Sequence, residues 1–226
     1  MKTKINSLEK MILVSIGFTM SLLFIRILFT RELTYGFFPW NTILAVIPLL
    51  FSRKLSIRKE WDRHTIILLL GWLLFFPNAP YIITDLFHFS KDEGVPFWFD
   101  LILVVSGTWN GMLLGLISLM QVEQFLQKKL SRNMASFTIM ICILLCGYGI
   151  YLGRYLRYNS WDILTKPYDL ISVMTDHILS PFENTRIWAF TLGFSLMFGI
   201  IYFTIKQLIV LILSETHQKI TEISPD

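Results

Sequence analysis

Five long apolar runs constrain this chain more than any other feature of its sequence. A helix that crosses the hydrocarbon core of a bilayer needs about 20 predominantly apolar residues. Runs of this kind lie at 11–29, 65–84, 97–120, 133–153 and 187–205. A sixth run, 36–51, is shorter and contains Pro39 and Pro48. We therefore predict an all-α, polytopic transmembrane helical bundle with about six spans, which forms a single integral membrane domain over residues 1–226.

The distribution of Lys and Arg predicts how these spans are oriented. With six spans and a cytoplasmic N-terminus, the inner segments hold 13 Lys and Arg and the outer segments hold 6. With five spans, the best arrangement places 11 inside and 8 outside. Because cytoplasmic loops are enriched in Lys and Arg, these counts favour six spans with both termini in the cytoplasm. The two arrangements agree on the orientation of every span after residue 64.

The net charge and the cysteines argue against several classes of protein. The net charge of +4 follows from the Lys and Arg of the cytoplasmic loops, and no basic arm indicates binding to a nucleic acid. Cys142 and Cys146 share one helix face without a nearby His or carboxylate, so we expect them to pack in the core and predict no metal site. The sequence leaves any cofactor open. Gly107, Gly111 and Gly115 recur every four residues and predict close packing between helices of the same chain.

The sequence PNAPY at residues 77–81 interrupts the third span. Pro77 removes a backbone donor and disfavours a continuous helix. Asn78 suits an N-cap position, and Pro80 suits the first turn of a new helix. We therefore predict a discontinuous helix that restarts at residue 79. Its free N–H groups and positive dipole end would face a cavity in the outer half of the bilayer.

One further helix is predicted outside the spans, at about 168–180. Leu170, Val173, Met174 and Ile178 fall on one helical stripe of this segment. A helix with one apolar stripe between two spans is typical of an amphipathic helix at the membrane surface.

Ionisable side chains gather at the predicted outer ends of the spans. Asp85 and His88 follow the interrupted segment and share a helix face with Tyr81, and Asp100 lies in the first turn of the fourth span. Acid–base chemistry by Asp85, His88 or Asp100 is one interpretation. The other is that Asp85 and His88 end their helix in water and that Asp100 complements the helix dipole.

Two arginines at the outer end of the fifth span run against the positive-inside bias. Arg154 and Arg157 are at i, i+3 and would share one helix face. Asp85, His88 and Asp100 would lie opposite that face. Three interpretations are open for these arginines: they pair with carboxylates of the protein, they extend toward lipid headgroups, or they bind an anion. Anion binding is chemically suited to them, because guanidinium groups form paired hydrogen bonds with phosphate and carboxylate. We expect a binding site on this side, near Arg26, Trp40 and Asn41, made by Asn78, Tyr81, Arg154, Arg157, Asn159, Ser160, Trp161 and Asp162.

The segments PNAPYIITDLFHF, FWFD and GYGIYLGRYLRYNSWD together resemble a family of bacterial membrane proteins known as domain of unknown function 1361. The resemblance extends over nearly the whole chain. It implies a small polytopic protein of the bacterial cytoplasmic membrane. The family has no established activity, so the resemblance implies no catalytic residue.

Three classes of function follow from these features. The first is binding or processing of an anionic lipid or lipid-linked envelope precursor at the outer polar site. The second is transport of a small solute, to which the broken helix would be suited, although no internal repeat is present. The third is a non-catalytic assembly partner in a membrane complex, in which the polar residues are structural. No serine–histidine, zinc-protease or phosphate-loop motif indicates a particular reaction.

Overall fold

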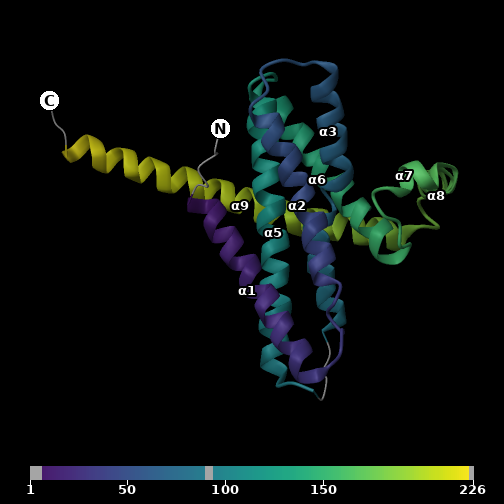
Figure 1. The fold of residues 1–226 in the computed structure, drawn as a ribbon. Helices are drawn as coiled ribbons and strands as arrows, with labels where there is room; N and C mark the ends of the chain where they lie inside the picture. Colours follow the sequence, from purple (N-terminus) through teal and green to yellow (C-terminus); the bar gives the residue numbers. More distant parts are fainter. Residues whose placement is uncertain (1–6, 90–93, 224–226) are drawn as a thin grey trace.

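A computed structural model describes the backbone of residues 7–89 and 94–223 and the side chains of these residues up to position 216. The described residues form helices only, which confirms the predicted all-α class. In chain order the elements are α1 (Ser7–Thr30), α2 (Phe38–Ser56), α3 (Arg63–Phe75), α4 (Asn78–Tyr81), the 3₁₀ helix η1 (Ile82–His88), α5 (Phe97–Gln127), α6 (Arg132–Tyr155), α7 (Asp162–Thr165), α8 (Pro167–Leu179) and α9 (Thr185–Ile223) (Figure 1).

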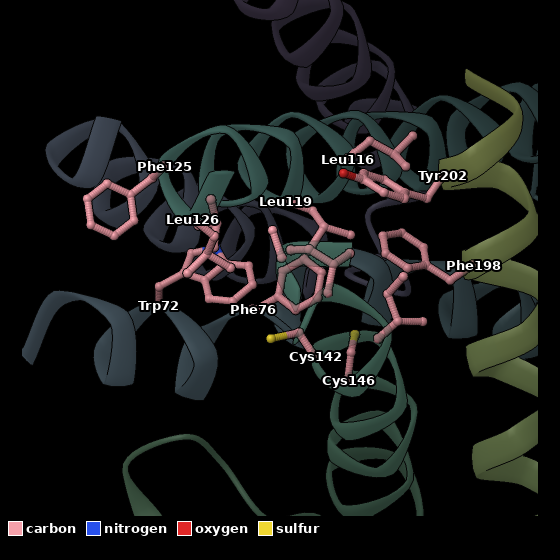
Figure 2. Packing of buried hydrophobic residues seen from close by; sticks show 14 of the residues in the cluster. Trp72, Phe76, Leu116, Leu119, Phe125, Leu126, Cys142, Cys146, Phe198 and Tyr202 are labelled. Atoms are coloured by element: carbon pink, nitrogen blue, oxygen red, sulfur yellow. The ribbon is translucent and has the colours of Figure 1, made fainter. Parts of the chain in front are cut away.

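Helix α5 is the centre of the bundle. More than half of its most apolar window is buried (56%), against 17% for α1 and 11% for α9. One apolar cluster joins α5 to α3, α6 and α9 and includes Trp72, Phe76 and Phe198 (Figure 2). A second cluster joins the first half of α5 to α1, α2 and η1. Every other long helix therefore packs, directly or through a neighbour, on this one element.

The two cysteines are packing residues, as the sequence predicted. Cys142 and Cys146 are buried in the first apolar cluster, on the side of α6 that faces Phe76 (Figure 2). Close helix contacts at glycines are also confirmed. A Cβ atom on Gly111 would lie 2.5 Å from the carbonyl oxygen of Ala79, and one on Gly149 would lie 2.7 Å from the ring of Pro77. The glycines let α5 and α6 approach the interrupted third span from two sides.

Five helical segments are long and apolar enough to cross a membrane: Ser7–Thr30, Arg63–His88, Phe97–Gln127, Arg132–Tyr155 and Thr185–Thr216. Helix α2 has 19 residues but is not among them. The predicted count of six spans therefore stays a prediction. Helix α9 continues well beyond the predicted end at residue 205, and its C-terminal part extends away from the bundle (Figure 1).

The interruption of the third span is less pronounced than predicted. Regular α-helix stops at Phe75, and one turn from Asn78 leads into the 3₁₀ helix. The backbone nevertheless stays in the right-handed helical region at Phe76 and Pro77. The predicted N-cap at Asn78 is wrong, because Pro77 occupies that position and no side chain caps the new turn. A four-residue turn of this kind supplies no dipole end for a ligand.

The peripheral helix is present as α8, but its apolar stripe differs from the prediction. Leu170, Val173 and Met174 are at least half-buried, whereas Ile178 is exposed. The buried residue that completes the stripe is His177. The stripe that the sequence assigned to the membrane surface therefore lies largely against the protein.

A buried ion pair fixes α1 to α5. The Nε atom of Arg26 donates to Asp100 Oδ1 at 2.8 Å, and a second guanidinium nitrogen donates to Oδ2 at 3.1 Å. Both side chains are almost fully buried, and the guanidinium also lies over the ring of Tyr35. Two parallel bonds of this kind match the planar guanidinium to the carboxylate.

Replacing Arg26 with Met should destabilise the protein strongly, because it leaves the Asp100 carboxylate buried without its partner. Breaking a buried ion pair in this way costs about 3–5 kcal/mol. Replacing Arg58 with Ala is the matched control, since its ion pair with Asp62 is exposed and such pairs contribute about 0–1 kcal/mol. Thermal melts in detergent measure both changes. Equal melting temperatures for the two variants would contradict the structural role of the Arg26–Asp100 pair.

Candidate functional site

A cavity of about 390 Å³ lies where the interrupted third span, α2, the end of α6 and the α7–α8 segment meet. This volume is within the range of about 300–1,000 Å³ that is typical of small-molecule sites. Its polar lining residues are Asn41, Asn78, Tyr81, Arg157, Tyr158, Asn159 and Ser160, and its apolar ones include Trp40, Leu44, Leu74, Leu152, Ile163 and Leu170. Among the described residues that line the cavity there is one Arg and no Asp or Glu. The cavity is therefore amphipathic and positively charged.

The break at Pro77 explains how the cavity wall is held together. Because Pro77 has no N–H and the next residues do not continue the α-helix, carbonyl groups at the end of α3 lose their usual partners. The hydroxyl of Ser160 donates to the carbonyl of Leu74 at 3.0 Å, and the amide of Asn78 donates to that of Phe75 at 2.9 Å. Asn78 also donates to Ser160 Oγ at 2.9 Å. Asn78 and Ser160 thus tie the loop after α6 to the broken helix.

Asp85 is buried at the end of the same segment and is bound from two sides. Its Oδ1 lies 3.6 Å from a guanidinium nitrogen of Arg154, and its Oδ2 accepts a hydrogen bond of 3.0 Å from the amide of Asn41. The guanidinium of Arg154 also lies over the ring of Phe87. Arg154 is therefore neutralised within the protein, and it does not line the cavity. Asn41 lines the cavity and donates to Asp85, so it connects the cavity to the Arg154–Asp85 ion pair.

Arg157 is different from Arg154 in three respects. It lies beyond the end of α6, so the predicted i, i+3 helical pairing with Arg154 is wrong. Its backbone has φ 59°, a left-handed conformation that costs a residue with a side chain about 1–3 kcal/mol. Its side chain is exposed, lines the cavity and has no ion pair with any residue that the structure describes. It is the cationic group of the cavity that a ligand would meet.

Asp162 and Trp161 shape the loop rather than line the cavity. The backbone N–H of Asn159 donates to Asp162 Oδ2 at 2.7 Å, and the hydroxyl of Thr165 donates to Oδ1 at 2.9 Å. These hydrogen bonds hold the pKa of the Asp162 carboxyl below its usual range. Trp161 packs edge-on against Trp40, with ring centroids 6.2 Å apart. Both residues fix the position of Asn159 and Ser160 in the cavity wall.

Two candidate residues lie elsewhere. Asp100 was expected opposite the arginines at the end of α6, but it is bound by Arg26, which the sequence placed only near the same face. His88 is exposed at the end of η1, with its ring against Phe37. Asp85, His88 and Asp100 do not line the cavity, so their predicted role in acid–base chemistry stays a prediction.

Sequence reasoning missed two buried polar clusters. The hydroxyl of Tyr148 and Nδ1 of His177 are 2.9 Å apart, and the indole of Trp188 donates to the His177 carbonyl at 3.3 Å. At another place in the bundle Glu123 accepts hydrogen bonds of 2.6 Å from both Tyr202 and Lys206. The signal for the second cluster was a Glu inside an apolar helix, which calls for a partner. The signal for the first was His177 on the buried stripe of α8.

The described residues contain no group of three His, Cys, Asp or Glu side chains placed to hold a metal ion. The cavity instead combines the guanidinium of Arg157, which has no ion pair among the described residues, with amide and hydroxyl groups and an apolar wall. Guanidinium and amide donors are complementary to anionic groups, and apolar side chains are complementary to apolar ones.

The fold and the cavity define a multi-span helical protein with a polar cavity at the ends of its spans. The sequence pattern of the family described as "Protein of unknown function (DUF1361)" matches residues 40–202, which is well over half of the chain. The chain belongs to this family, and the matched segment contains every residue that lines the cavity. No curated protein and no solved structure matches the chain.

Proposed function

We propose that the cavity binds the anionic headgroup of a membrane lipid or of a lipid-linked envelope precursor. The observation that carries this proposal is Arg157, a guanidinium group that lines the cavity without an ion pair in the described residues. Guanidinium groups bind phosphate and carboxylate through two parallel hydrogen bonds. The apolar residues of the same lining would contact the part of the lipid next to its headgroup.

The backbone conformation of Arg157 supports the same proposal. A left-handed residue after a helix is usually Gly or Asn, because a side chain is strained there. An Arg at such a position lowers the free energy of unfolding relative to a Gly, because Gly adopts the left-handed conformation without strain. Strained positions of this kind cluster at ligand sites. Arg31, after α1, has the same conformation and does not line the cavity, so the strain supports a site only together with the position of Arg157 in the cavity lining. Arg154, three residues earlier, has no such strain and has its partner in Asp85.

The proposal predicts that binding and stability separate at Arg157. Replacing Arg157 with Gly should keep or raise the melting temperature, because it relieves the left-handed backbone. It should also lower the occupancy of bound phosphatidylglycerol about 10- to 100-fold, since a hydrogen bond to a charged group contributes about 1.5–3 kcal/mol. Native mass spectrometry of the purified protein with added phosphatidylglycerol, beside a thermal melt, measures both.

Arg154 provides the matched control for this experiment. Replacing Arg154 with Gln leaves the buried Asp85 carboxylate without its cation, so this variant should melt earlier. Once folded, it should bind phosphatidylglycerol better than the Arg157→Gly variant does. Wild-type lipid occupancy in the Arg157→Gly variant would overturn the proposed function. A wild type that carries no anionic lipid would overturn it as well.

We also propose a location for the site. The resemblance to the family implies the bacterial cytoplasmic membrane. The count of Lys and Arg favours both termini in the cytoplasm, which would place the cavity at the extracytoplasmic face. Both span counts give the end of α6 this orientation. Arg58 and Lys59 lie between α2 and α3, and Arg63 begins α3; such basic residues are typical of a cytoplasmic loop.

Cysteine labelling in intact cells tests this orientation. In a variant without Cys142 and Cys146, single cysteines at Ile57 and at Leu164 replace exposed side chains. A membrane-impermeant thiol reagent should label the cysteine at position 164 and leave position 57 unlabelled until the cells are opened. Labelling of position 57 in intact cells would contradict six spans. Protection of position 164 would contradict the extracytoplasmic cavity.

A further inference from the structure

Helix α8 has more apolar surface than its packing on the protein uses. At about 100° per residue, one stripe contains Leu170, Val173, Met174 and His177, which are all at least half-buried. Leu170 lines the cavity. His177 is held by Tyr148 of α6 and by the indole of Trp188 of α9. This inner stripe accounts for how the helix is attached to the bundle.

A second apolar stripe on α8 faces away from the protein. Tyr168, Ile171, Ile178 and Leu179 are 87%, 61%, 61% and 75% exposed. Tyr168 and Leu179 lie opposite the inner stripe, whereas Ile171 and Ile178 lie beside it, next to Met174, and the exposed Thr175 lies among these four residues. The exposed polar residues Asp169, Ser172 and Asp176 form a third stripe between the other two. A helix in water with one protein contact needs one apolar stripe, so the second stripe indicates another apolar environment.

The position of α8 identifies this environment as the bilayer. The helix lies between the end of α6 and the start of α9, two of the candidate membrane spans, and to one side of the bundle (Figure 1). The exposed apolar residues of α8 therefore lie next to the ends of two helices that are long and apolar enough to cross a bilayer. The polar stripe carries Asp169 and Asp176 and no Lys or Arg, so attraction to anionic headgroups does not hold the helix there. Burial of apolar side chains does.

We propose that α8 is a lid over the cavity whose outer stripe is embedded in the bilayer interface, so that the ligand is a lipid that enters the cavity from the bilayer. This inference rests on the proposed function of the cavity. The same helix contacts the cavity through Leu170 and the lipid through Tyr168 and Ile171. A lipid that passes beneath α8 would keep its chains in the membrane while its headgroup reaches Arg157. A water-soluble anion would have no need of the outer stripe.

Spin labels on α8 test the position of the lid. In a variant without Cys142 and Cys146, single cysteines at Tyr168, Ile171 and Ile178 carry the label, and cysteines at Asp169 and Asp176 are the matched controls on the polar stripe. The protein is reconstituted in vesicles of phosphatidylcholine and phosphatidylglycerol. Labels on the outer stripe should collide more often with oxygen than with a water-soluble nickel complex, and the control labels should show the reverse. High salt should leave both patterns unchanged.

Two outcomes would overturn the lid. Outer-stripe labels that collide mainly with the nickel complex would place the helix in water. Labels that are protected from both reagents would show that a second copy or another protein covers the stripe. Neither outcome bears on Arg157, so the proposed function is judged separately.

A competition experiment tests the route of the ligand. Millimolar inorganic phosphate should leave bound phosphatidylglycerol in place, and replacing Tyr168, Ile171 and Ile178 together with Ser should slow its uptake from vesicles. Displacement by phosphate, together with normal uptake in the triple variant, would overturn entry from the bilayer and leave an anion site at Arg157. Loss of binding in the Arg157→Gly variant alone supports the site whichever route the ligand takes.

Discussion

The ion pair between Arg154 and Asp85 is the interaction on which the arrangement of the site depends. It joins the end of α6 to the end of the interrupted third span, and Asn41 adds α2 to the same carboxylate. A carboxylate and a guanidinium in an apolar surrounding are costly unless they are paired, so each side chain fixes the other. Arg154 is used in this way, and Arg157, in the loop that follows α6, is the one Arg among the described residues that line the cavity. The positive charge of the cavity thus comes from Arg157, because Arg154 is used to join α6 to the interrupted third span.

The second constraint is the backbone at Pro77. Breaking the helix there leaves carbonyl groups that must find donors, and Asn78 and Ser160 provide them. The loop from Arg157 to Asp162 is fixed by this contact and by the hydrogen bonds to Asp162, so its left-handed residue is held in place despite its strain. The interrupted span therefore shapes the cavity wall through carbonyl groups that side chains satisfy, while the predicted dipole end is absent.

The sequence was sufficient for the fold class, because long apolar runs and their spacing depend on local composition alone. Five of the predicted binding residues, Asn78, Tyr81, Arg157, Asn159 and Ser160, line one cavity, although they come from two distant segments of the chain. What it could not distinguish was which charged groups are already paired. Arg26 and Asp100 are 74 residues apart, and their pairing depends on how α1 packs on α5. Likewise, helical spacing predicted that Arg154 and Arg157 act together, but the helix ends between them, and Arg157 itself has a left-handed backbone.

The central claim is that the guanidinium of Arg157, which has no ion pair among the residues that the structure describes, binds the headgroup of an anionic lipid. An experimental structure of the full chain in nanodiscs that contain phosphatidylglycerol tests this claim most directly. The account predicts density for a phosphate within hydrogen-bond distance of the Arg157 guanidinium, with the lipid chains leaving the cavity beneath α8. An Arg157 side chain paired with a carboxylate of the protein, beside a cavity that contains only water, would contradict it.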